Sequence, residues 1–125
     1  MIECPDELST SVLDAAFEVH RELGSGLLES VYEAALGMAL SERGISWRRQ
    51  IEVQARFHGK DLGLGFRADM VVAGSLLLEI KAVDAILPVH LAQIMTYMKL
   101  LDMRRGYLLN FNEHLFKHGI KRVSL

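Results

Sequence analysis

The hydrophobic pattern of the chain changes its period after Gly44, and this change constrains the fold more than any other feature. Before Gly44, apolar residues recur every three or four positions, which predicts helices at 8–23 and 28–43. After it, apolar and polar residues alternate along 45–57, which predicts a half-buried strand. A chain that carries both periods must pack helices against a sheet.

The rest of the chain predicts further strands and one more helix. Turn-forming residues at 58–61 and 73–75 separate extended segments at 62–72 and 76–81. Pro88 suits the first turn of a helix at 88–102, and two more strands are expected at 105–111 and 120–125. For the helix at 28–43 we expect a buried stripe made of Val31, Ala34, Ala35, Leu36, Met38 and Ala39.

This order of elements predicts an α/β or α+β sandwich around one mixed central sheet. The segment Trp47 to Lys81 should form an antiparallel meander flanked by helices. The strand that follows the third helix is expected to return parallel, by a crossover connection.

Size and composition limit the class of protein. With 125 residues, 14.0 kDa and 50% hydrophobic residues, the chain is expected to form one domain, residues 1–125, and disorder is excluded. A domain this small leaves apolar surface exposed, so we expect a homodimer. A formal net charge of −2 excludes coating nucleic acid by bulk charge, although local basic patches remain open.

The N-terminus and the cysteine content indicate a cytoplasmic protein. Cys4 is the single cysteine, which excludes an intramolecular disulfide and a cysteine-based zinc site. The acidic N-terminus does not read as a signal peptide. The longest uncharged apolar stretch, Met70 to Leu78, is far shorter than the roughly 20 residues that span a bilayer, so no membrane partner is expected.

Charged residues interrupt the apolar strands at Asp69, Glu79 and Lys81. Side chains alternate along a strand, so Glu79 and Lys81 should point to the same face. If the turn is centred on Gly74, antiparallel pairing places Asp69 opposite Glu79, with Cβ atoms about 5 Å apart. Facing carboxylates repel unless a proton or a cation lies between them, and Mg²⁺ or Mn²⁺ prefers such oxygens.

Two interpretations of these charges remain open at this stage. In one, Lys81 orients or deprotonates a water and stabilises charge that develops on a phosphate. In the other, Asp69 pairs with Lys81 and Arg67 pairs with Glu79 as ordinary cross-strand ion pairs.

Two helices offer further candidates. Gln93 and Tyr97 lie four residues apart and share a helix face. Glu29 falls in the first turn of its helix, with Tyr32 on the same face. The alternatives are a helix-terminal charge for Glu29 and core packing for the two tyrosines.

The segment Gly26 to Tyr32 reads Gly-Leu-Leu-Glu-Ser-Val-Tyr and resembles the G-x-x-E-x-x-Y signature of the GxxExxY protein family. Five later segments resemble further blocks of the same family, in the same order from Val12 to Val123: Arg67–Met70, Leu78–Ala82, Gln93–Tyr97, Asn110–Asn112 and Gly119–Arg122. That family is placed in the PD-(D/E)XK nuclease-like superfamily. The resemblance implies a restriction-endonuclease-like core and a metal-dependent phosphodiesterase site.

The resemblance also implies roles for individual residues. Asp69 and Glu79 would be metal ligands, and Lys81 would be the catalytic lysine of the E-x-K element. Glu29 would be an extra acid from the preceding helix and a third metal ligand. Gln93 and Tyr97 match a Q-x-x-x-Y element that frames the site. Ala68 replaces the proline of the superfamily's name, a change that removes no ligand.

These features predict a Mg²⁺- or Mn²⁺-dependent nuclease that hydrolyses phosphodiester bonds of DNA or RNA. The alternative from another class is a catalytically silent nuclease-like module for binding or assembly in a DNA-processing or defence complex. A weaker interpretation is a hydrolase of nucleotides or other small phosphoesters. The small size and modest charge favour help from a protein partner or a second copy.

Overall fold

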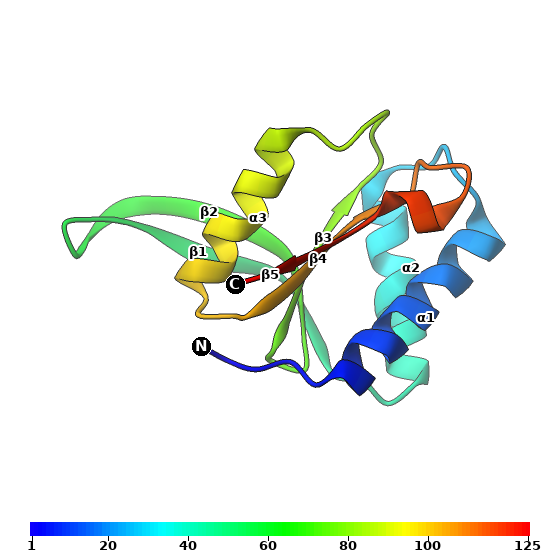
Figure 1. Ribbon diagram of the computed structural model, residues 1–125, viewed down its shortest axis with the longest axis horizontal. Coiled ribbons are helices and arrows are strands. Elements are labelled where there is room, and N and C mark those ends of the chain that lie inside the picture. Colours follow the sequence, from blue (N-terminus) through cyan, green and yellow to red (C-terminus); the bar gives the residue numbers. More distant parts are fainter.

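The computed structural model describes all 125 residues and places one sheet between two helical layers (Figure 1). The elements in chain order are α1 (Asp6–Leu23), α2 (Glu29–Glu42), β1 (Trp47–Phe57), β2 (Lys60–Val72), β3 (Leu76–Lys81), α3 (Pro88–Leu100), β4 (Arg105–Asn110), the 3-10 helix η1 (Phe116–Gly119) and β5 (Ile120–Ser124). The predicted helices and strands are confirmed, with ends that differ by a few residues. The element η1 was not predicted.

The sheet has five strands in sequential order, β1-β2-β3-β4-β5. The pairs β1–β2, β2–β3 and β4–β5 are antiparallel, whereas β3 and β4 are parallel and joined through α3. The mixed sheet, its antiparallel meander and the parallel return are therefore confirmed. This arrangement is consistent with a restriction-endonuclease-like fold.

Each face of the sheet carries its own hydrophobic core. The helices α1 and α2 cover one face, and the largest fully buried side chains in that core include Tyr32, Leu36, Met70, Leu78 and Phe111. Helix α3 covers the other face, where its buried residues are Ile94, Tyr97 and Met98. None of the helices combines the length and hydropathy that crossing a bilayer requires.

The predicted buried stripe of α2 is right in part: Leu36 and Ala39 are buried, whereas Val31, Ala34 and Met38 are exposed. The exposed fractions of Val31 and Met38 are 41% and 67%, whereas Tyr32, outside the predicted stripe, is fully buried. Apolar residues occur all around this helix, so their spacing alone fits two neighbouring stripes. Gly37 decides between them, because a Cβ on it would lie 2.7 Å from the Trp47 ring and only a glycine permits this close packing.

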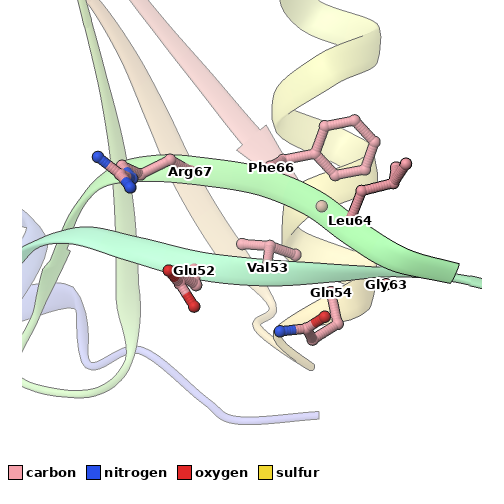
Figure 2. A pocket seen from close by; sticks show the side chains of 8 residues that line it. Glu52, Val53, Gln54, Gly63, Leu64, Phe66 and Arg67 are labelled. Atoms are coloured by element: carbon pink, nitrogen blue, oxygen red, sulfur yellow. The ribbon is translucent and has the colours of Figure 1, made fainter. Parts of the chain in front are cut away.

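The outer part of the β1–β2 hairpin extends beyond α3 and the rest of the sheet (Figure 1). Residues 60–67 of β2 are all exposed. We call the outer part of the hairpin, residues 52–67, the hairpin arm. A pocket of about 280 Å³ lies along it (Figure 2), where Leu64 and Phe66 point to the opposite side of the arm from Glu52 and Gln54.

Candidate active site

Asp69 and Glu79 face each other at the point where β2 and β3 separate. The ladder pairs Met70 with Leu78, and the next position in this register joins Asp69 to Glu79. Each carboxylate accepts a backbone hydrogen bond from the other strand. The Asp69 N–H donates to Glu79 Oε2 at 2.9 Å, and the Ile80 N–H donates to Asp69 Oδ2 at 2.8 Å. The predicted juxtaposition of the two acids is confirmed.

Strand β1 is irregular at the position opposite Asp69. Gln50, which lies opposite Asp69, has a φ of 53° and no paired partner, although its neighbours Arg49 and Ile51 pair normally. The Gln50 side chain instead donates to both carboxylate oxygens of the buried Glu33 on α2, at 3.0 and 3.3 Å. Asp69 is the position of β2 that this gap in the β1 ladder leaves without a paired partner.

The acid pair lies on the α3 face of the sheet. Leu77 packs in the α3 core, and Glu79, two residues later, points to the same side. Glu79 is only 3% exposed. Burial, followed by repulsion from the Asp69 carboxylate, raises the pKa of Glu79 to about 8. Without a cation, Glu79 therefore carries a proton at neutral pH.

Tyr97 of α3 belongs to the same cluster. It is buried, and its pKa is raised by burial and then by the charges of Glu79 and Asp69. Its ring lies 5.5 Å from that of Phe66, measured between centroids. Gln93 is exposed one turn earlier and lines a small apolar pocket with Phe66 and Tyr97. The structure thus brings Tyr97 to the acids and places Gln93 further out.

Lys81 is half-buried at the end of β3, and the alternation of the strand turns it toward the same face as Glu79. Its backbone is fixed, because it pairs with Asn110 in β4 and its carbonyl accepts the Phe111 N–H at 2.9 Å. Its ammonium group makes no hydrogen bond or ion pair. The four ion pairs of the structure lie elsewhere, so the alternative of cross-strand pairs through Lys81 and Arg67 is wrong.

The loop between α1 and α2 positions Glu29 at the end of β3. The Tyr32 hydroxyl donates to the Gly24 carbonyl at 2.6 Å and accepts the Leu27 N–H at 3.2 Å, which shapes the loop. Glu29 Oε2 then accepts the Ala82 N–H at 3.1 Å, directly after Lys81. Glu29 is exposed and lies outside the Asp69–Glu79 pair.

Asn110 and Asn112 complete this end of the site, and no role for them was predicted from the sequence. Asn110 is fully buried, accepts the Val83 N–H at 3.1 Å and donates to the Val83 carbonyl at 3.0 Å. Asn112 accepts the Gly26 N–H at 3.2 Å. The sequence signal for them is the block Asn110–Asn112, directly after the apolar run 107–109, which resembles the family but indicates no contact.

The donor set fits a hard divalent ion in part. Asp69 and Glu79 offer only carboxylate oxygens, and their repulsion is a penalty that a cation would remove. No group of three or more His, Cys, Asp or Glu side chains lies close enough together to hold a metal ion. Asp69 and Glu79 therefore form the core of any such site, and its remaining oxygen ligands would be waters, Glu29 or phosphate oxygens of a substrate.

Comparison with known proteins agrees with this architecture. No curated protein and no solved structure matched the chain. A family model described as the PD-(D/E)XK nuclease superfamily matches residues 6–123, which include the three helices, the acid pair, β1 to β4 and all of β5 except Ser124. With nearly the whole chain matched, the protein belongs to the PD-(D/E)XK nuclease superfamily.

Proposed function

We propose that this protein hydrolyses phosphodiester bonds of DNA or RNA with the help of Mg²⁺ or Mn²⁺. The observation that carries the proposal is the reciprocal facing of Asp69 and Glu79 on the α3 face, with Lys81 two residues further along β3. Membership of a nuclease superfamily supports the same reaction class. We also propose that the chain belongs to the GxxExxY branch, which the spacing of Gly26, Glu29 and Tyr32 supports. Of these three residues, Glu29 contacts Ala82, directly after Lys81.

In this proposal Asp69, Glu79 and Glu29 are the metal ligands. When bound, the ion would polarise a phosphoryl oxygen and lower the pKa of the attacking water. Glu79 must lose its proton before it can bind the ion, because burial and Asp69 favour its neutral form. The free Lys81 ammonium would stabilise negative charge on the phosphate in the transition state. Tyr97 would hold the inner side of the site, and Gln93 would contact the substrate backbone.

Cleavage of labelled nucleic acid tests this function. Single- and double-stranded DNA and RNA would each be incubated with the protein in Mg²⁺, Mn²⁺ or EDTA. We expect cleavage of at least one substrate with either metal and none in EDTA. The Asp69→Asn protein, which keeps an oxygen for the Ile80 N–H, is the matched control and should be inactive. Cleavage that persists in EDTA would contradict the proposal.

A second candidate is a catalytically silent binding or assembly module. One observation favours it: Glu29 is bonded to the Ala82 backbone and does not join the other two acids. In that case no substrate would be cleaved under any metal condition, while nucleic acid would still bind. The same incubations, followed by a binding measurement, separate the two functions.

A further inference from the structure

A second pocket, of about 380 Å³, lies between the C-terminal turns of α1 and the segment that enters η1. We call it the basic pocket. The half-buried Phe17 and the buried Phe116 form its apolar floor, and the exposed Leu115 lies at its mouth. Its rim carries only residues that are or can become cationic: His20, Arg21, His114 and Lys117. Figure 1 shows η1 beside this end of α1.

The charge of the basic pocket is unbalanced. No acidic side chain lines it, although the whole chain has more acidic than basic residues. Arg21 and Lys117 are exposed and take part in none of the ion pairs. Glu18, one turn before Arg21, is bonded to Arg43 at 3.0 Å. The rim therefore presents free positive charge to an anion.

The floor of the basic pocket is built before any ligand arrives. Phe116 stacks on His20 with centroids 5.2 Å apart and meets the edge of Phe17 at 5.1 Å. His20 is held by a 2.7 Å hydrogen bond between Nε2 and the Glu113 carbonyl. Leu115 leaves 51% of its surface exposed at the mouth. Phe116 is 3% exposed and stacks on both His20 and Phe111, so the exposed Leu115 is the apolar contact left for a ligand. An apolar contact beside a cationic rim suits a nucleotide, which joins a base and a sugar to a phosphate, better than it suits a bare anion or an acidic peptide.

Asn112 connects the basic pocket to the candidate active site. Its amide accepts from Gly26 and donates to the Val83 carbonyl at 3.4 Å, and it lies two residues before His114. Val83 in turn lies two residues after Lys81. The path from His114 to Asn112, across the hydrogen bond to Val83 and on to Lys81 sets an upper limit on the distance between the basic pocket and Lys81. At about 3.5 Å per residue, this limit is roughly 25 Å. Glu79 lies two residues before Lys81, so the acid pair, on the other face of the sheet, is at most roughly 32 Å from the pocket. A strand that rises about 3.4 Å per nucleotide covers this span with about nine nucleotides.

From this combination we infer that the basic pocket binds one nucleotide of a DNA or RNA strand whose scissile phosphodiester lies at the acid pair. The inference rests on the proposed function and adds a substrate requirement to it. The substrate is a polymer long enough to reach from the basic pocket to the acid pair. A mononucleotide or a very short oligonucleotide is too short to be a substrate. Arg21 and Lys117 contact phosphates, and Leu115 contacts a base or sugar.

Binding of a fluorescein-labelled 12-nucleotide single strand in EDTA, followed by anisotropy between 50 and 300 mM KCl, tests the inference without any cleavage. We expect the Arg21→Gln/Lys117→Gln protein to bind about tenfold more weakly at low salt. Loss of two phosphate contacts should also reduce the slope of log K against log salt by about 1.4, at roughly 0.7 per contact. Leu115→Ser should weaken binding with little change in slope.

Two matched variants serve as controls. Lys99→Gln/Arg104→Gln removes the same charge near the opposite end of β4 and should bind like the unmodified protein. Arg21→Lys/Lys117→Arg keeps the charge and should keep the slope. Equal binding by the pocket variant and the Lys99/Arg104 control would overturn the inference. Displacement of the strand by polyglutamate at equal charge would also overturn it, because the pocket would then be a general polyanion site.

The assay also separates this inference from the proposed function. A protein that cleaves nucleic acid but whose pocket variant binds normally would refute the pocket and leave the nuclease assignment standing. A protein that shows the expected loss of binding but never cleaves would support the pocket and favour the silent module.

Discussion

Replacing Lys81 by alanine is expected to lower the rate of phosphodiester cleavage on the order of 10²–10³-fold, the usual cost of removing one group that stabilises transition-state charge. The fold should be unaffected, because the ammonium group makes no hydrogen bond or ion pair. The contacts that fix this residue are made by its backbone, to Asn110 and Phe111. Initial rates of cleavage in Mg²⁺ and thermal unfolding of both proteins provide the measurement.

Lys99→Ala is the matched control for this substitution. It removes a lysine from the exposed end of α3, outside the candidate site, and should leave the rate unchanged. If Lys81→Ala cleaved as fast as the unmodified protein, Lys81 would have no part in the mechanism. Reduced cleavage together with a lowered melting temperature would instead indicate a structural role.

In EDTA, the folded protein is expected to lose stability as the pH rises from about 4.5 to about 8. Glu79 binds its proton more tightly in the folded state, where its pKa is about 8, than in the unfolded chain, where it is near 4.5. A raised carboxyl pKa stabilises the fold fully below the lower value, and this contribution disappears as the pH passes the upper one. At about 1.4 kcal/mol per unit, the loss is on the order of a few kcal/mol.

Chemical denaturation across this pH range measures the loss directly. Glu79→Gln, whose amide oxygen can still accept the Asp69 N–H, should show little loss and should be more stable than the unmodified protein at pH 9. Asp69→Asn removes the repelling charge and should shift the decline to lower pH. Identical pH profiles for the unmodified protein and Glu79→Gln would mean that the two carboxylates do not share a buried site.

Local patterns were sufficient to predict much of the fold. The turn at Gly74 sets the register of β2 against β3. Asp69 lies five residues before Gly74 and Glu79 lies five residues after it, so their pairing could be predicted from this hairpin alone. The parallel return of β4 follows from the helix that precedes it. In α2, by contrast, apolar residues surround the helix, and contacts with other elements, such as Gly37 against Trp47 and Tyr32 on Phe111, hold the buried side.

The supporting contacts of the site could not be predicted in this way. Glu29 reaches Ala82 across 53 residues of sequence, and Asn110 reaches Val83 across 27. The irregular strand position at Gln50 depends on Glu33, a residue of another element. Such contacts depend on how whole helices and strands pack against one another, and the hydrophobic periodicity of the sequence does not predict them. The basic pocket joins the end of α1 to an unpredicted 3-10 helix for the same reason.

The central claim is that Asp69 and Glu79 hold a divalent ion between them on the α3 face. The most direct measurement is a titration with Mn²⁺ followed by electron paramagnetic resonance at pH 8, which counts free ion in solution. We predict that the unmodified protein binds one Mn²⁺ and that Asp69→Asn and Glu79→Gln each weaken binding about tenfold or more. Equal binding of Mn²⁺ by all three proteins, or none by the unmodified one, would contradict the claim.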